Sequence, residues 1–205
     1  MEWEEVDKLL KDQIEKRLNF KKGLQEINET LEQHKLPLIS VDQEALENEF
    51  NSWLKELLEH EPLPAEIKSL YFGINHLSFP EIESGKMQTT IYLAGSPFLP
   101  HNNPDWAAAS SFYPDRRYLI LEAFANLGDR IRHEKLSPDY EVLCLNGMLN
   151  LLLMNLLESF KDTLLEYEVK SWGLFSKRKE RESLFVGAGS DSGDIYLLME
   201  LKKPV

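Results

Sequence analysis

Cysteine is almost absent from this sequence of 205 residues, which contains only Cys144. A single cysteine cannot form an intramolecular disulfide, and it cannot supply the several thiolates of a cysteine-based metal site. Because Cys144 lies among leucines, we expect it to behave as a small buried hydrophobic residue. The cysteine content therefore excludes a disulfide framework and a cysteine-rich zinc site within one chain.

Positive charge is also scarce, with 23 Lys and Arg against 35 Asp and Glu and a formal net charge of −12. A nucleic-acid-binding protein needs a basic face for the phosphates, so this balance argues against that class. The acidic surface would attract a basic protein, although acidic residues also serve solubility. The only basic run, residues 177–181, we interpret as a solvated loop.

The sequence has no long uninterrupted hydrophobic run. Its most apolar stretch, Val142–Leu157, is interrupted by three asparagines and Gly147, and it is shorter than the roughly 20 residues that span a bilayer. We therefore predict a central helix that is buried on all sides, entered at Ser137-Pro138 and returning to solvent at Glu158–Asp162. The acidic N-terminus lacks the pattern of an export signal, so a cytoplasmic location without membrane association is expected.

The first third of the chain has the apolar spacing of amphipathic helices. Residues 2–33 are predicted to form one bent helix or two helices, with the change of register near Gly23. A further helix is expected to follow Pro37, capped by Ser40 or Asp42, and to end before Pro62. These segments predict an N-terminal helical pair over residues 1–62.

The remainder, residues 63–205, contains several short segments in which apolar and polar residues alternate, as they do in strands. Residues 67–77 and 87–95 predict an antiparallel hairpin, residues 118–121 a short strand or helix start, and residues 122–133 a helix. A strand is expected within 169–174, and residues 184–186 and 195–199 predict a terminal hairpin around a turn at 187–194. The fold class predicted is α+β, with a mainly antiparallel sheet packed on the buried central helix, as a second domain or as part of one continuous domain.

Two segments outside this framework are candidates for binding. The proline-rich loop 95–114 contains Trp106 and Tyr113, residue types that often anchor protein interfaces but also fill cores. The turn 187–194 contains Asp191 and Asp194, whose side chains can bond their own backbone or contact a ligand. With Asp105, these five residues form our candidate partner-binding set: Asp105, Trp106, Tyr113, Asp191 and Asp194.

No catalytic constellation is evident in the sequence. The turn 187–194 matches neither phosphate-binding fingerprint, and it lacks the spacing of a calcium loop. His101 and Asp105 could be a base and the group that orients it, but no serine or cysteine lies in a nucleophile turn. Asn146 and Asn150, one helical turn apart, are expected to hydrogen-bond a neighbouring strand. We predict no catalytic residues, no metal site and no cofactor.

Two short motifs of the second half carry a resemblance to a known family. They are Ile91-Tyr92-Leu93-Ala94-Gly95-Ser96 followed by Asp105-Trp106-Ala107, and Val186-Gly187 followed by Ser192-Gly193-Asp194-Ile195-Tyr196-Leu197. These resemble patterns in bacterial immunity proteins of polymorphic-toxin systems. The resemblance implies a non-enzymatic α+β inhibitor that binds a cognate toxin. The long acidic helical segment at the N-terminus departs from that pattern.

We therefore expect a non-enzymatic cytoplasmic protein that binds a protein partner, with a basic toxin as the partner that the resemblance implies. One alternative is a small-molecule hydrolase or transferase with a pocket between the 95–114 loop and the 187–194 turn. That alternative requires His101, Asp105, Asp191 and Asp194 to converge on one cleft. A third is a structural protein that self-associates through Trp3 and Trp53 of the helical pair.

Overall fold

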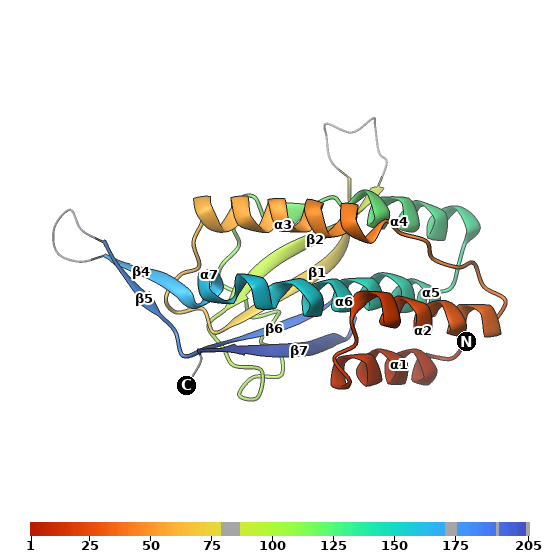
Figure 1. Ribbon diagram of the computed structural model, residues 1–205, viewed down its shortest axis with the longest axis horizontal. Coiled ribbons are helices and arrows are strands. Elements are labelled where there is room, and N and C mark those ends of the chain that lie inside the picture. Colours follow the sequence, from red (N-terminus) through yellow and green to blue (C-terminus); the bar gives the residue numbers. More distant parts are fainter. Residues whose placement is uncertain (79–86, 171–175, 192, 204–205) are drawn as a thin grey trace.

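The computed structural model of the chain describes residues 1–78, 87–170, 176–191 and 193–203. Its centre is a continuous helical rod, Pro138–Leu165, with the sheet on one side and other helices around it (Figure 1). The rod consists of α5 (Pro138–Glu141), a π-helical turn (Val142–Asn146), α6 (Gly147–Leu156), a 3₁₀ turn (Leu157–Phe160) and α7 (Lys161–Leu165). The predicted central helix is confirmed.

The start of this rod is determined by the residues at that end, and its exposure changes near the other end. The Ser137 side chain accepts a hydrogen bond from the Tyr140 backbone N–H, and Pro138 occupies the first turn, where its missing N–H costs nothing. All residues from Leu143 to Leu153 are buried, whereas Glu158 and Asp162 are exposed. The apolar stretch is thus sheltered by the protein's own elements, as predicted.

By length and composition alone, the rod would also pass as a membrane span. Among the described residues it is the one helix that meets this test, and 72% of its most apolar window is buried inside the fold. A core helix and a membrane helix share these two properties, so the cytoplasmic location stays a prediction.

The N-terminal segment forms three helices, α1 (Trp3–Glu15), α2 (Phe20–Gln33) and α3 (Gln43–His60). Residues 2–33 are therefore two helices, and the break lies before Gly23, at Arg17 with its positive φ of 48° and at the capping residue Asn19. Gly23 lies inside α2, where a Cβ atom would come within 2.2 Å of Leu151 Cδ2. The glycine permits close packing on the rod rather than marking the break.

Of the two capping residues predicted for α3, the structure uses Asp42, which accepts a hydrogen bond from the Ala45 backbone N–H. The buried stripe of α3 follows the predicted spacing: Leu46, Phe50, Leu54, Leu57 and Leu58. All three N-terminal helices contact α6, and their apolar residues belong to the same core cluster as those of the sheet.

The main sheet has five strands in the order β3-β2-β1-β6-β7. Strands β1 (Ser69–Ser78) and β2 (Met87–Ser96) form the predicted antiparallel hairpin, and β3 (Tyr118–Leu119) extends it. Strand β6 (Ser183–Ser190) pairs parallel to β1 and antiparallel to β7 (Ile195–Lys202). The mainly antiparallel sheet is confirmed, as is the helix that follows β3, α4 (Glu122–Glu134). The hairpin connection with Pro80 and Gly85 lies outside the described residues.

Two sequence interpretations are corrected by the strands. The segment Gly187–Ser190, predicted as part of a turn, continues strand β6. Its glycines allow neighbouring groups to pack close to the strand, since a Cβ atom on Gly189 would lie 2.2 Å from the Asp194 carbonyl oxygen. The basic run, predicted as a loop, falls mainly in β5 (Ser176–Glu180), which pairs with β4 (Glu166–Lys170) in a separate hairpin. The predicted strand at 169–174 is β4 in part, and residues 171–175 lie outside the described residues.

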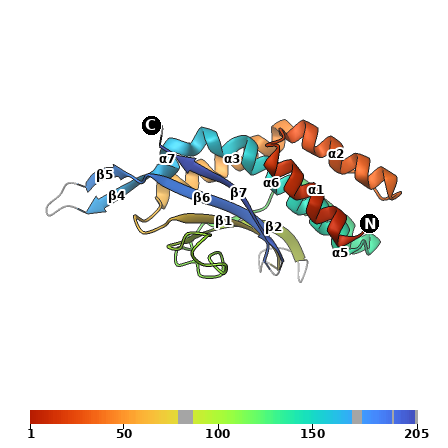
Figure 2. The same ribbon diagram turned by 90° about the horizontal axis from the view of Figure 1, so that it is seen from below.

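The two faces of the main sheet have different coverings. Helix α3 and the central rod lie on one side, and the loop between β2 and β3 lies on the other (Figure 2). Helix α4 belongs to the side of the rod, because its buried Phe124, Leu127 and Ile131 share the core cluster of the rod. Because side chains alternate along a strand, Leu70, Phe72 and Ile74 face the helices while Tyr71 and Gly73 face the opposite way. We call the side that carries Tyr71 and Gly73 the open face.

Candidate functional site

The open face is built on matched positions of three strands. The pairing places Gly73 of β1 between Tyr92 of β2 and Gly189 of β6. A Cβ atom on Gly73 would lie 2.2 Å from Tyr92 Cε1, so the tyrosine ring lies across the strand where the glycine has no side chain. The small residue thus allows Tyr92 to reach over β1 toward the end of β6.

The loop between β2 and β3 places a second aromatic residue on this face. The Trp106 ring lies 6.2 Å from the Tyr71 ring at 86°, and it covers Gly187, where a Cβ atom would come within 2.9 Å. Reciprocal backbone hydrogen bonds between Gly95 and Phe112, of 2.8 and 3.0 Å, hold the base of the loop against β2. The loop is therefore fixed to the sheet at its base and through Trp106.

Between this loop and the turn after β6 lies a pocket of about 220 Å³. Its polar and aromatic lining consists of Tyr71, Tyr92, Tyr113, Ser190 and Asp191, and small or aliphatic residues complete it. The enzyme alternative placed a pocket between the 95–114 loop and the 187–194 turn, and the structure has a concave site there, lined by Ala107, Ala108 and Tyr113 on one side and by Ser190, Asp191 and Gly193 on the other.

Asp191 is the charged group of this pocket. Its Oδ1 accepts a hydrogen bond from the Tyr92 hydroxyl at 2.5 Å, and its Oδ2 accepts one from Asn75 Nδ2 at 3.1 Å. The Asp191 backbone N–H donates to the Ile74 carbonyl oxygen at 3.0 Å, which anchors the turn to β1. The carboxylate is therefore held in place by two neutral donors from the sheet.

The hydroxyls of Tyr71 and Tyr92 remain protonated donors. Burial, and then the hydrogen bond to Asp191, raises the pKa of Tyr92 far above its ordinary value. Burial, with a smaller contribution from the negative charge of Asp191, raises the pKa of Tyr71 in the same direction. The Tyr71 hydroxyl donates to the Ser190 carbonyl oxygen at 3.1 Å, so both phenols form hydrogen bonds with residues at the end of β6.

The five candidate partner-binding residues have different positions. Tyr113 and Asp191 line the pocket together. Trp106 is only 4% exposed, and its ring packs within the chain instead of being presented to a partner. Asp105 and Asp194 are exposed and are not part of the pocket lining.

The enzyme alternative requires four residues to converge, and the structure does not bring them together. Asp191 lines the pocket, but His101 packs its ring against Phe185, with centroids 5.9 Å apart. Asp105 and Asp194 do not line the pocket. In the described part of the chain, no group of three His, Cys, Asp or Glu residues could hold a metal ion.

Sequence reasoning missed Tyr71, Tyr92 and Asn75 as members of the site. Within residues 67–77, the alternation of Leu70, Phe72 and Ile74 identifies only the helix-covered face. The alternate residues of the same segment, Tyr71, Gly73 and Asn75, could have indicated the site, since they place an aromatic residue, a glycine and an amide in a row on the other face.

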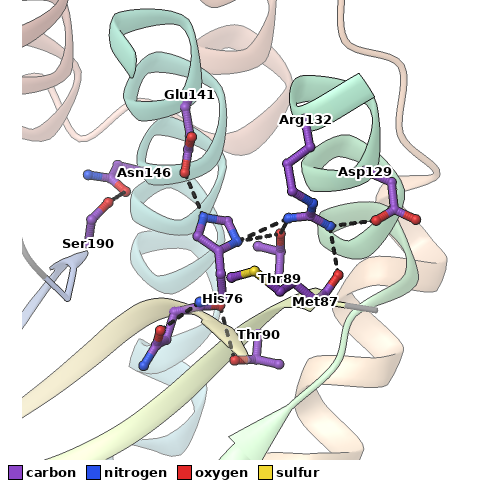
Figure 3. A network of polar contacts seen from close by, with 10 residues as sticks. His76, Met87, Thr89, Thr90, Asp129, Arg132, Glu141, Asn146 and Ser190 are labelled. Carbon is purple, nitrogen blue, oxygen red and sulfur yellow. Dashed lines mark hydrogen bonds and ion pairs between the residues drawn. The ribbon is translucent and has the colours of Figure 1, made fainter. Parts of the chain in front are cut away.

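A second polar cluster lies on the helix-covered side, near the hairpin end of β1 and β2 (Figure 3). His76 Nε2 contacts Glu141 Oε1 at 2.7 Å, while Arg132 Nη2 donates to the Met87 carbonyl oxygen at 2.9 Å and to Asp129 Oδ1 at 2.5 Å. Thr89 Oγ1 lies 3.1 Å from His76 Nδ1. These contacts fasten α4 and α5 to the strands, which is a structural role.

The same view contains the predicted hydrogen bond of Asn146. The Ser190 hydroxyl of β6 donates to Asn146 Oδ1 at 3.0 Å (Figure 3), which confirms the expectation for this residue. Asn150, one turn further along, is 2% exposed, and neither atom of its amide has a hydrogen-bond partner among the described residues. The expectation is wrong for Asn150.

Comparison of the chain with protein-family models, with curated proteins and with solved structures finds no match.

Proposed function

We propose that this chain is a non-enzymatic protein that binds a basic protein partner through its open face. The observation that carries the proposal is the pocket lined by tyrosines and Asp191, bordered by exposed apolar side chains. Tyr113 is 49% exposed, Ile195 37% and Leu197 46%. Ile195 lines the pocket, and Leu197 pairs with Gly187 on the same face. Exposed apolar residues grouped around a concave site are typical of protein interfaces.

The charge beside the open face supports a basic partner. Asp105, Asp191 and Asp194 place exposed carboxylates in the segments that border this face. Complementary charge speeds association and selects against wrong partners. With the resemblance to bacterial immunity proteins, these features support a cytoplasmic role in neutralising a basic toxin.

Both alternatives have weaker support. The pocket of about 220 Å³ is smaller than the roughly 300–1,000 Å³ of typical small-molecule sites. Self-association through Trp53 would compete with its internal contacts, because its indole N–H donates to the Arg116 carbonyl oxygen at 3.0 Å and its ring packs on Phe50 at 5.6 Å.

Affinity capture from the native host at low salt tests the proposal. We expect the wild-type chain to recover one basic protein, and higher salt to weaken the complex. The double change Ile195→Asp and Leu197→Asp should reduce recovery at least about 30-fold, as loss of a central apolar contact does. A protein encoded beside this chain that is recovered in this way, and whose toxicity the wild-type chain suppresses, would identify the partner.

The matched control is Leu38→Asp. Leu38 is an equally exposed leucine, but it lies between α2 and α3, away from the open face. This variant should recover the partner as wild type does. Recovery of no partner at low salt, or equal recovery by the Ile195 and Leu197 double variant, would contradict the proposal.

A further inference from the structure

We propose that the pocket formed by Tyr71, Tyr92, Tyr113 and Asp191 binds the cationic end of one lysine or arginine side chain of the partner. The inference rests on the proposed function and specifies the chemical group that the site recognises. It depends on three features: the tyrosine rings in the lining, the Asp191 carboxylate, which has no ion-pair partner among the described residues, and the volume of the pocket.

Aromatic rings form the walls. The Tyr71 and Tyr92 rings lie 5.9 Å apart at 71°, so they form two adjoining sides at a steep angle, and Tyr113 belongs to the loop side. The faces of aromatic rings carry negative potential and attract an ammonium or guanidinium group within about 6 Å of the ring centre. Three such rings around one pocket favour a cation over a neutral or anionic group.

Asp191 adds a carboxylate that has no ion-pair partner among the described residues. Its two hydrogen bonds come from a phenol and an amide, and no Lys or Arg of the described residues forms an ion pair with it. A carboxylate offers about four acceptor positions, so two remain for a donor from outside. The pocket therefore favours a cation that can donate hydrogen bonds.

The size of the pocket fits one side chain. Its volume of about 220 Å³ corresponds to roughly seven water molecules at about 30 Å³ each. Ala94, Ala107 and Ala108 supply small apolar surface beside the tyrosines, against which the methylene groups of a lysine or arginine can pack. A basic side chain would thus bury its stem on the alanines and place its charge at Asp191.

The chain itself shows that the neighbouring tyrosines accept a guanidinium. The Arg117 Cζ atom lies 4.7 Å from the Tyr118 ring centre and 5.9 Å from the Tyr113 ring centre. Arg117 is not part of the pocket lining, so this contact leaves the Asp191 side open. The same aromatic chemistry is available to a cation that enters from a partner.

A small-molecule titration of the full chain tests the chemistry directly. The probe is n-butylammonium chloride, followed by NMR of the tyrosine rings, with n-butanol as neutral analogue and sodium chloride at matched ionic strength. We expect saturable shifts of Tyr71, Tyr92 and Tyr113 with a Kd on the order of 10 mM, and no saturation with butanol. Tetramethylammonium, which cannot donate a hydrogen bond, should bind more weakly.

A charge-matched pair of variants localises the effect. Asp191→Asn keeps an acceptor for Tyr92 but removes the charge in the pocket, whereas Asp162→Asn removes the same charge from an exposed position of α7, outside the lining. The first should weaken butylammonium binding at least tenfold, and the second less than about twofold. Equal effects of the two variants, tighter binding of tetramethylammonium, or absence of saturable shifts would overturn the inference.

The capture experiment separates this inference from the proposed function. If Asp191→Asn retains the partner while the Ile195 and Leu197 double variant loses it, the open face is the interface and the cation inference is wrong. If butylammonium binding depends on Asp191 but no partner is captured through the open face, the pocket chemistry stands and the proposed function fails.

Discussion

The two faces of the main sheet show how one set of strands serves two purposes. On the helix-covered face, Phe72 is fully buried and its ring lies 6.0 Å from the Phe50 ring of α3. On the open face, the preceding residue, Tyr71, packs against aromatic rings and directs its hydroxyl to Ser190. The covered face is stabilised by dense apolar packing, whereas the open face combines rings with hydrogen bonds that fix a polar site.

The hydrogen bonds of polar groups also differ between the two faces. The phenols of Tyr71 and Tyr92 both have acceptors, so the open face holds Asp191 with neutral donors. The covered side buries two amides of the central rod: Asn146 has a partner, and Asn150 has none in the described part of the chain. We therefore expect substitutions on the covered side to affect stability most, while the recognition that we propose uses the open side. Three measurements can break or sharpen this contrast.

The largest effect is expected from truncating the covered face. Phe72→Ala should lower the free energy of unfolding by about 3–5 kcal/mol, because it removes buried apolar surface and leaves a cavity under α3. Its matched control on the open face, Leu197→Ala, should change it by less than about 0.5 kcal/mol. Urea unfolding with an unchanged m value measures both. A comparable loss in the two variants would break the contrast.

A smaller effect of opposite sign is expected at Asn150. Asn150→Leu removes a buried amide that has no hydrogen-bond partner within the described ranges, so it should raise the free energy of unfolding by about 1–3 kcal/mol. Asn146→Leu is the control one helical turn away. It leaves the Ser190 hydroxyl without its acceptor and should destabilise the protein by a similar amount. Destabilisation by both changes would show that Asn150 has a partner, such as an ordered water.

The covered side was largely predictable from the sequence because its signals are local. Ser137-Pro138 and Asp42 mark helix starts by their own side chains, and the spacing from Leu46 to Leu58 identifies the buried stripe of α3. The apolar stretch around Leu149 predicts burial on all sides whatever its neighbours are. Periodicity and capping therefore suffice for the helices and for the hairpin of β1 and β2.

The open face was less predictable because it depends on pairing between distant segments. Asp191 meets Tyr92 only because β6 joins β1 in parallel, a crossover that the sequence does not encode locally. The glycines of β6 carried an ambiguous signal, since a turn and a close approach of Trp106 both require a missing side chain. The sequence suggested a pocket between the two segments, but only the topology shows that Tyr71 and Tyr92 of the sheet line it.

The third measurement uses the reactivity of the Cys144 thiol to test whether the covered side excludes water. Burial raises the pKa of the Cys144 thiol to about 12. The native chain should therefore resist a thiolate-directed reagent such as dithionitrobenzoate at about pH 8, and it should react with one equivalent once unfolded.

The sign of the pH dependence follows from the same shift. The unfolded thiol ionises near its ordinary pKa of about 8.5, so the stabilising contribution is complete below that value and is lost as the pH rises toward 12. Between about pH 7.5 and about pH 9.5 the loss should be about 1 kcal/mol. Cys144→Ala, although less stable overall, should lack this part of the decline. Rapid labelling of the native chain, with no such decline in stability, would place water beside the central rod and make the two sides of the sheet alike.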